Sequence, residues 1–208
     1  GGKPQSGGRI DYNNYNSSAL YASLPAGAER VSVRNVYDGD TLTPTDGRRV
    51  RFLGIDTPEI EEQQPYALEA KAYTKDRCNK QDIWISFEPG QSRTDHYDRL
   101  LAFVWVREGD KHICMNESIV GAGYASAYIP NKSSKLHNWD KFLALQKEAI
   151  LSRRGMWKSF QDHEVVKTKN GSAYHRRDCE HISSVRNLTT LKASEALSQG
   201  LHACRTCL

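Results

Sequence analysis

The first third of the chain alternates hydrophobic and polar residues with the two-residue period of β-strands. A run that begins at Val31 is followed by similar runs over residues 41–43 and 50–55. Between the last two, residues 45–47 read Thr-Asp-Gly, which are residue types of a tight turn. Residues 30–56 are therefore predicted to form an antiparallel meander of strands.

The middle of the chain shows both periodicities. Strand-like alternation covers residues 82–88, 100–106 and 112–116, with a turn over 108–111. Helical spacing of hydrophobic residues covers residues 66–79, 116–121 and 137–152. Short strands with helices packed on one side predict an α+β fold, mainly β, in which a small barrel carries helices.

Changes in composition divide the chain into four parts. Residues 1–29 are rich in Gly, Ser, Asn and Ala and are predicted to be a flexible leader, with a short turn of helix near residues 17–22. Residues 30–158 carry the strand and helix patterns of one domain. Residues 159–170 are polar and are predicted to be a linker, and residues 171–208 form a small cysteine-bearing module.

Composition and charge narrow the class of protein without giving its function. Hydrophobic residues make up 38% and charged residues 26% of the 208 residues, as in a folded domain. The net charge of +4 suits a polyanionic partner without requiring one. No apolar run approaches the roughly 18–20 residues that span a bilayer, so no membrane span is expected. The opening Gly-Gly-Lys-Pro has no apolar signal-peptide region.

The stretch 37–59, YDGDTLTPTDGRRVRFLGIDTPE, places several carboxylates beside an arginine. Hydrolysis of a phosphodiester needs an aimed water molecule and cancellation of the negative charge that builds up around phosphorus. Two carboxylates can hold a hard divalent cation, a third can take the proton of the water, and arginines can bind the phosphate. Candidates for these tasks in this stretch and at the start of a later strand are Asp40, Asp56, Glu59, Arg51 and Arg99.

Six motifs follow one another between residues 30 and 158: YDGDTL, VRFLGIDTPE, YALEAKAYTK, RTDHYDRLLAFVWV, MNESIVGAGYA and RRGMW. In order and spacing they resemble the staphylococcal (thermonuclease-type) nuclease family. The resemblance implies a five-stranded oligonucleotide-binding (OB-fold) barrel with about three helices. It also implies a calcium-dependent phosphodiesterase that cleaves DNA and RNA, favours single strands and leaves 3′-phosphates.

The resemblance also implies roles for the acidic residues. Asp40 and Asp56 resemble the carboxylates that bind Ca²⁺, and Thr57 resembles the residue whose backbone carbonyl binds the same ion. Glu59 resembles the general base of the family. Asp38 matches an aspartate that supports the ion site from outside.

The basic and aromatic residues are matched in the same way. Arg51 and Arg99 resemble the two phosphate-binding arginines, and Tyr97 the tyrosine that contacts a terminal phosphate. Tyr128, in a Tyr-x-Pro-Asn element, is the first choice for a base-stacking ring, with Tyr124 as the reserve. Packing or simple surface exposure remains an alternative for both substrate-binding candidates, Tyr97 and Tyr128.

Three positions depart from the family pattern. Ser126 stands where a second tyrosine often lies, which weakens the expected base platform. His96 replaces a basic residue before Tyr97. Asp98 replaces a glycine next to Arg99, where its carboxylate could pair with an arginine or weaken phosphate binding.

The cysteine-bearing module, residues 171–208, suggests a second metal site. His175 and Cys179 are separated by three residues, and Cys204 and Cys207 by two. Four ligands in two short pairs fit a tetrahedral, structural Zn²⁺ site, which a module of this size needs for stability. The segment also resembles small zinc modules such as the metal-binding domain of the Ada repair protein, in which a helix, here residues 194–199, separates the ligand pairs.

Alternatives remain open for the cysteines. Cys204 and Cys207 could instead form a disulfide, and His181 and His202 are spare ligands. Cys78 and Cys114 are most simply buried thiols, with a disulfide between them as the alternative. The basic residues of the module are consistent with DNA contact and equally with a solvated surface.

Three functional hypotheses follow from the sequence. The first is a calcium-dependent nuclease with a zinc module, expected to act as a monomer. The second is a nucleic-acid-binding module with little or no catalysis, and the third is mainly a zinc-dependent interaction module. Family resemblance favours a secreted or periplasmic protein, whereas thiolate zinc ligands also fit a reducing bacterial cytoplasm.

Overall fold

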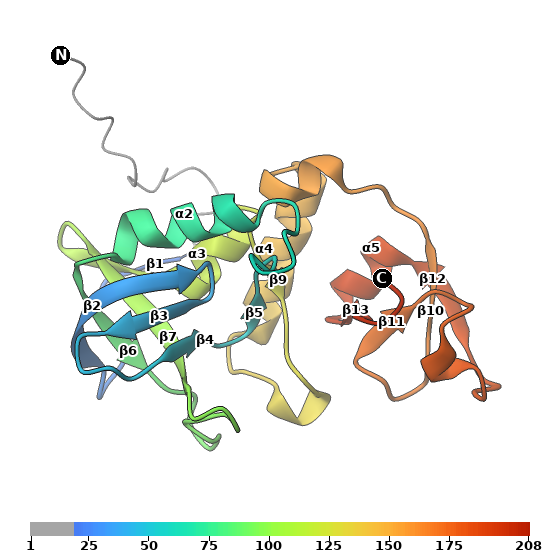
Figure 1. The fold of residues 1–208 in the computed structure, drawn as a ribbon, viewed down its shortest axis with the longest axis horizontal. Helices are drawn as coiled ribbons and strands as arrows, with labels where there is room; N and C mark the ends of the chain where they lie inside the picture. The colour runs from blue at the N-terminus through green and yellow to red at the C-terminus, as the bar shows by residue number, and fades with distance from the viewer. Residues whose placement is uncertain (1–18) are drawn as a thin grey trace, which may run out of the picture.

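The computed structural model describes residues 19–208, which form a β-barrel part and a smaller C-terminal part (Figure 1). Most of the predicted leader, residues 1–18, lies outside the described residues. Where the sequence suggested a turn of helix, the described residues Leu20–Tyr21 form a strand, β1, instead. Within residues 19–208, none of the helices has the length and apolar character needed to cross a membrane.

Five strands close the barrel in the order β7-β4-β3-β2-β6, because β6 also pairs with β7. The pairing of β4 with β7 is parallel and the others are antiparallel. β1 and β8 extend the sheet beyond β7. The strands are β2 (Glu29–Asp38), β3 (Thr41–Pro44), β4 (Val50–Phe52), β6 (Asp82–Ser86), β7 (Leu100–Glu108) and β8 (Lys111–Cys114). This arrangement confirms the predicted α+β fold with a five-stranded OB-fold-type barrel.

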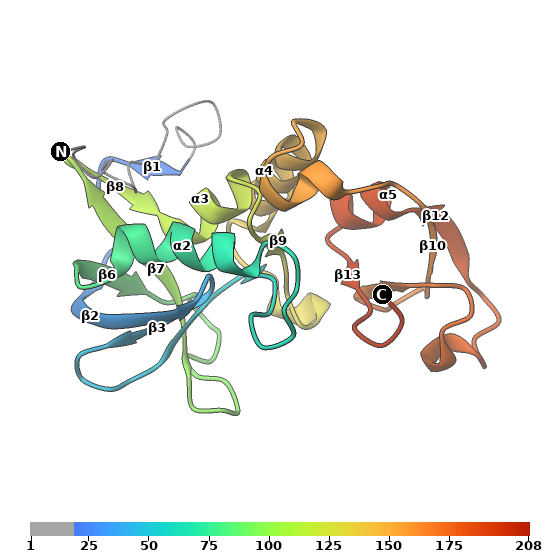
Figure 2. The ribbon, with the colours of Figure 1, turned by 45° about the horizontal axis from the view of Figure 1, so that its top comes forward.

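Among residues 19–208, three helices accompany the barrel, as predicted, and the view in Figure 2 shows α2 lying across it. The hydrophobic residues of the alternating pattern fill the interior of the barrel, where Leu42, Val50, Phe52 and Ile83 are buried. The elements are α2 (Ala67–Cys78), α3 (Met115–Gly121), α4 (Trp139–Leu151), the 3₁₀ turns η1 (Lys132–Ser134) and η2 (Gly155–Ser159), and the paired strands β5 (Ile55–Asp56) and β9 (Ser126–Ala127).

The C-terminal part is a four-stranded sheet with one helix, and we call it the zinc module after the zinc site that the sequence predicts. Its strand order is β12-β10-β11-β13. Strand β10 lies within residues 159–170, which the sequence predicted as a linker. The elements are β10 (Glu164–Lys167), β11 (Ala173–His175), η3 (Glu180–Ile182), β12 (Thr189–Lys192), α5 (Ala193–Ser198) and β13 (His202–Ala203).

The zinc module packs against α4 through a buried interface. One hydrophobic cluster contains Ala149 and Trp157 of the barrel part together with Leu197 and Leu201 of the module. The buried side chain of Gln146 joins the two parts, because its Oε1 accepts the Ala127 N–H at 2.8 Å and its Nε2 donates to the Leu197 carbonyl at 3.2 Å.

Gly200 brings the two parts close together in this interface. Gly200 has φ of +83°, a left-handed conformation that glycine adopts without strain. A Cβ atom on Gly200 would lie 3.0 Å from Cζ2 of Trp139. The position of the module relative to α4 therefore depends on a residue without a side chain.

Candidate active site

A tight β2–β3 connection places Asp40 at the mouth of the barrel. The register of β2 against β3 shifts between Val36 and Asp38, and such bulges re-aim the following side chains. The turn residue Gly39 is so closely packed that a Cβ atom would lie 2.8 Å from Thr57 Cγ2 and 3.0 Å from Cβ of Ala70 on α2. Thr74 on α2 donates its hydroxyl hydrogen to the Gly39 carbonyl at 2.7 Å and holds the turn in place.

The end of β5 brings Asp56 next to Asp40. Asp56 pairs with Ser126 of β9, which fixes its direction at the edge of the barrel. The following residue, Thr57, is buried and donates its backbone N–H to Asp40 Oδ2 at 3.1 Å. The two aspartates predicted to bind one cation are therefore brought together, with Thr57 beside them.

Arg51 lies between these two carboxylates. Its Nη2 is 3.3 Å from Asp40 Oδ2 and 3.6 Å from Asp56 Oδ1, and only 13% of its side chain is exposed. Burial favours the protonated form of Asp40, but Arg51 and the hydrogen bonds that Asp40 accepts outweigh it, so its pKa lies below the usual value. Burial dominates at Asp56, with Asp40 adding to it, and raises the pKa of Asp56 despite Arg51.

Asp38 supports Asp40 from behind. Its Oδ1 accepts the backbone N–H of Asp40 at 3.1 Å. Burial, followed by the charge of Asp40, raises the pKa of Asp38, so a proton is retained more readily there than on Asp40. The predicted supporting position of Asp38 agrees with this geometry.

The residues around Asp40 and Asp56 fit a divalent cation. Asp56 Oδ1 and Thr57 Oγ1 are buried and have no hydrogen-bond partner among the described residues. Carboxylate, carbonyl and hydroxyl oxygens are the ligands that Ca²⁺ prefers. A cation would remove the cost of the unpaired Asp56 oxygen and of the close approach of two carboxylates.

One cleft of about 410 Å³ collects most of the predicted catalytic set. We call it the acidic cleft, and its charged lining residues are Asp38, Asp40, Asp56, Glu59, Glu61, Arg49, Arg51, Arg99 and Arg205. Glu59 is only partly buried, and its backbone N–H donates to Gln64 Oε1 at 2.7 Å. Burial, together with Asp56 and Asp40, raises the pKa of Glu59.

Arg99 reaches the acidic cleft from the loop before β7. Its Nε lies 2.9 Å from Asp95 Oδ2, so Arg99 forms an ion pair with Asp95. The sequence analysis had considered Asp98 as a partner for an arginine. Asp98 is exposed and has φ of +62°, the left-handed conformation that the family glycine would adopt freely. Asp95 was missed by the sequence analysis, although its spacing of four residues from Arg99 was a usable signal.

Tyr97 lies beside the cleft rather than in it. Its side chain is 61% exposed and its ring stacks at 4.0 Å against His96, while the Arg99 guanidinium lies 5.4 Å from the ring centre. Arg49, another residue that the sequence analysis missed, donates from Nη2 to the Tyr97 carbonyl at 2.7 Å. This bond holds the loop of Tyr97 and Arg99 against β4.

The two aromatic candidates have different surroundings. Tyr124 packs on Tyr73 with ring centres 5.9 Å apart and contacts the hydrophobic core, as a packing residue does. Tyr128 lies in a second cleft, where its ring is 4.8 Å from the ring of His202 in the zinc module. Tyr128, the first choice for base stacking, thus contacts a ring from the other part of the chain.

Arg205 is the largest addition to the predicted site. It belongs to the zinc module, yet its Nη2 lies 3.2 Å from Asp56 Oδ2. The charge of Asp56 raises the pKa of Arg205, so the guanidinium is fully charged. The sequence analysis counted Arg205 only as one basic residue of the module, because 149 residues separate it from Asp56.

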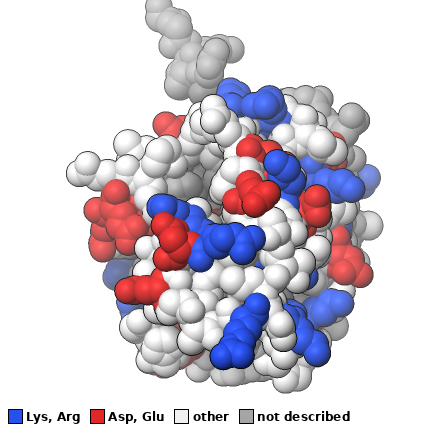
Figure 3. All heavy atoms as spheres, turned by 90° about the vertical axis from the view of Figure 1, so that its right-hand side faces the viewer, with Lys and Arg blue, Asp and Glu red and all other residues white. Residues whose placement is uncertain are grey.

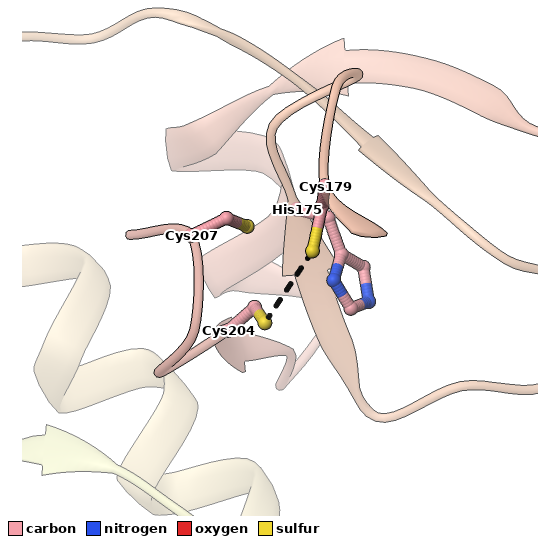
Figure 4. Close-up of side chains that lie close together, drawn as sticks. All are labelled: His175, Cys179, Cys204 and Cys207. Atoms are coloured by element: carbon pink, nitrogen blue, oxygen red, sulfur yellow. Dashed lines mark hydrogen bonds between the residues drawn. The ribbon is translucent and has the colours of Figure 1, made fainter. Parts of the chain in front are cut away.

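The four predicted zinc ligands meet in the module (Figure 4). Their ligand atoms all lie within 4.8 Å of one another, and Cys179 Sγ is 4.0 Å from Cys204 Sγ. Nδ1 of His175 is buried without a hydrogen-bond partner among the described residues. Three thiols and an imidazole at this separation fit a tetrahedral Zn²⁺ site, which would use the unpaired His175 nitrogen or its ring neighbour.

All five cysteines are free thiols. The alternative of a disulfide between Cys204 and Cys207 is therefore not what the structure shows. Cys78 and Cys114 are fully buried in the barrel part, which agrees with their prediction as apolar thiols. Burial raises the pKa of Cys78 to about 12 and that of Cys114 well above the usual value, so both remain protonated.

The outer face of the zinc module does not present one uniform charge. Figure 3 views the molecule from the side of the module, and lysine and arginine side chains are interspersed there with acidic ones. Arg176, for example, pairs with Asp178 at 3.0 Å on the exposed surface.

Comparisons with known proteins agree with this geometry. The family described as "Staphylococcal nuclease homologue" matches residues 49–159. The chain is 31% identical to the "Thermonuclease" of Staphylococcus intermedius, over 71% of this chain and 88% of the relative. It is 30% identical to "Endonuclease YncB" of Bacillus subtilis, over 70% of this chain and 72% of the relative. The family match, the closed barrel and the grouped acidic and arginine residues together establish that the chain belongs to the staphylococcal nuclease family and is an enzyme of the nuclease class.

Proposed function

We propose that the protein hydrolyses phosphodiester bonds of DNA and RNA in a calcium-dependent reaction that leaves 3′-phosphates. The observation that carries the proposal is the acidic cleft, in which Asp40, Asp56 and Glu59 face Arg51 and Arg99. Three carboxylates without arginines would repel a phosphate, and arginines without carboxylates would bind it without activating water. The combination supports hydrolysis better than simple binding.

In the proposed mechanism, Asp40, Asp56 and the Thr57 carbonyl hold Ca²⁺. The ion, when bound, supplies positive charge that offsets the charge developing on the phosphate. Arg51 and Arg99 bind phosphate oxygens with their forked N–H donors. They lose part of their present pairing with Asp40, Asp56 and Asp95 when substrate and cation are bound.

Glu59 is the proposed general base. Its carboxylate takes a proton from a water molecule, whose oxygen forms a bond to phosphorus on the side opposite the 5′ oxygen. The bond between phosphorus and the 5′ oxygen breaks, and the 5′ oxygen takes a proton from solvent to become a hydroxyl. Burial raises the pKa of Glu59, with Asp56 and Asp40 adding to the effect, which makes it a stronger base than an exposed glutamate.

The test is a cleavage assay on single-stranded DNA and RNA with Ca²⁺ or with a calcium chelator, with analysis of the product ends. Cleavage is expected only with Ca²⁺, and Glu59→Gln is expected to lower kcat by about 10²- to 10⁴-fold. Glu69→Gln, which removes the same charge from the exposed face of α2, is the matched control and should cleave normally. Cleavage by Glu59→Gln at the normal rate would exclude the proposed base, and binding without any cleavage would favour the second hypothesis.

The pH dependence gives an independent check of Glu59. A general base works only when deprotonated, so kcat/KM should fall as the pH decreases through the pKa of Glu59. Because that pKa is raised, the fall should begin at a higher pH than for an exposed glutamate. In Glu59→Gln this acid limb should disappear from the residual rate, and an unchanged profile would assign the limb to another group.

A further inference from the structure

The zinc module contributes to a cleft next to the predicted catalytic residues. This second cleft, of about 600 Å³, shares Asp56, Glu59 and Arg205 with the acidic cleft. Its other lining residues come from both parts of the chain and include Tyr128, His202 and Tyr174. We call it the junction cleft. A substrate strand whose phosphate enters the acidic cleft must place its neighbouring nucleotide near this opening.

Arg205 is held at the boundary of the two clefts by its sequence position. It lies between Cys204 and Cys207, two of the four residues whose ligand atoms converge in the module. The backbone on both sides of Arg205 is therefore fixed when the metal site is formed. Its side chain remains 67% exposed and extends to 3.2 Å from Asp56.

The charge balance of the acidic cleft indicates that Arg205 can bind phosphate when a cation is present. In the structure, Arg51 and Arg205 together neutralise Asp40 and Asp56. A divalent cation on the two aspartates would replace these ion pairs. Arg205 would then be a charged fork at the edge of the cleft without its present ion-pair partner, and a phosphate oxygen is the partner that its geometry suits best.

Two rings lie beside this position. Tyr128 is 4.8 Å from His202 in a tilted arrangement, and the Arg205 guanidinium lies 5.9 Å from the centre of the Tyr128 ring. His202 Nδ1 is buried and has no hydrogen-bond partner among the described residues. Aromatic rings beside an arginine form the kind of surface that binds unpaired bases, whose faces a duplex hides.

Contacts between the zinc module and the barrel part fix the positions of Arg205 and His202 next to Tyr128. Besides the contacts of Gln146 and Gly200, the Ser172 hydroxyl donates to the Pro130 carbonyl at 3.3 Å, two residues after Tyr128. Arg205, His202 and Ser172 of the module thus all face the segment that carries Tyr128. The contacts fix Arg205 relative to Asp56 and not only relative to the zinc site.

We propose that the zinc module forms a subsite for the nucleotide next to the cleaved bond of a single strand, with Arg205 on its phosphate and Tyr128 and His202 beside its base. This inference rests on the proposed nuclease function. It makes Arg205 a third phosphate-binding arginine, supplied by the metal-binding turn. Binding of single strands would then depend on zinc, although no zinc ligand touches the substrate.

The test measures binding in the Glu59→Gln background with Ca²⁺, so that the probes remain intact. The probes are a short oligothymidylate and an abasic strand of the same length. Arg205→Ala is expected to raise Kd about tenfold for both probes and to lower the slope of log Kd against log salt by about 0.7. Tyr128→Ala is expected to weaken binding of the oligothymidylate more than that of the abasic strand.

Control variants separate the subsite from charge and folding. Arg186→Ala removes the same charge from the same module at a hollow lined only by module residues, and it should leave Kd nearly unchanged. Arg205→Ala should retain one zinc per chain by elemental analysis. After removal of zinc, or in Cys207→Ser, the Arg205→Ala substitution should cause no further loss of binding, since Arg205 is then no longer positioned.

Two results would overturn the inference. One is an unchanged Kd and salt slope in Arg205→Ala, while the wild-type protein cleaves normally. The other is tighter Ca²⁺ binding and faster cleavage in Arg205→Ala, which would make Arg205 a competitor of the cation rather than a ligand of phosphate. Absence of any cleavage by the wild-type protein would instead contradict the proposed function, so the two failures are distinguishable.

Discussion

The barrel part and the zinc module are stabilised by different means. The barrel encloses a continuous hydrophobic core, in which Phe52, Ile85 and Val104 are almost completely buried. The module has only a small cluster around its cysteines, formed by Val166, Cys179, Ile182 and Cys204. Its larger cluster is shared with α4 and η2 of the barrel part. We therefore expect the barrel to fold by burial alone and the module to depend on both a bound metal and its neighbour.

Zinc removal should give the largest difference in stability between the two parts. Structural zinc sites contribute about 10–16 kcal/mol to folding in small modules, which exceeds what the module core can supply. In Cys207→Ser, or with a strong chelator, hydrogen exchange should become fast at Val165 and Leu191 and remain slow at Val50 and Val104. NMR or mass spectrometry measures these hydrogen-exchange rates in the two parts.

A barrel thiol provides the matched control for this experiment. Cys78→Ala removes a cysteine that lies outside the four-residue cluster, so the chain should retain one zinc. If slow exchange at Leu191 survived the loss of zinc, the module would be stabilised mainly by its contact with α4.

A smaller effect is expected from Gln146→Leu, which cuts the polar link between the parts. The substitution leaves the Ala127 N–H buried without its partner, at a cost of about 1–3 kcal/mol. The Leu197 carbonyl loses the bond from Gln146 but keeps the one from the Gly200 N–H. Denaturant unfolding measures this loss. Exposed Gln81→Leu is the control, expected to stay within about 0.5 kcal/mol of the wild type. Equal stability of the two variants would show that the link contributes little.

The smallest expected effect concerns the loop of Arg99 within the barrel part. Asp98→Gly should stabilise the protein by about 1 kcal/mol, because glycine adopts the left-handed conformation at this position without a steric cost. Asp110→Gly, in the β7–β8 turn, is the control, since Asp110 has no positive φ and glycine should be neutral or destabilising there. Thermal unfolding measures the stability of both variants. A loss of stability in Asp98→Gly would show that the positive φ carries no steric cost at this position.

The barrel and its acidic residues were predictable because their signals are local. Alternation over residues 30–56 predicted the strands. The motifs that resemble the nuclease family implied that Asp40, Arg51 and Asp56 share one site, and the structure brings the three together. Strand β10 was missed because its four residues, Glu-Val-Val-Lys, are too few to show a period within a polar segment. Length as well as pattern limits what sequence periodicity can reveal.

The contribution of the zinc module to the site was not predictable in this way. The spacing of the four ligands indicated a metal site, but it carried no information on which surface the module covers. Arg205 and His202 acquire their meaning only from the docking on α4, through contacts such as that of Gly200 with Trp139. Such contacts depend on the shape of two folded surfaces rather than on neighbouring residues.

Strand β1 has a consequence for how molecules of this protein meet one another. Leu20 and Tyr21 pair with Ile113 and His112 of β8 and so cover hydrogen-bonding groups at the open end of the sheet. The Tyr21 hydroxyl donates to Glu117 at 2.8 Å and secures the cover. Uncovered strand edges invite pairing between chains. Two residues from the predicted leader thus cover part of a strand edge that would otherwise be open to another chain.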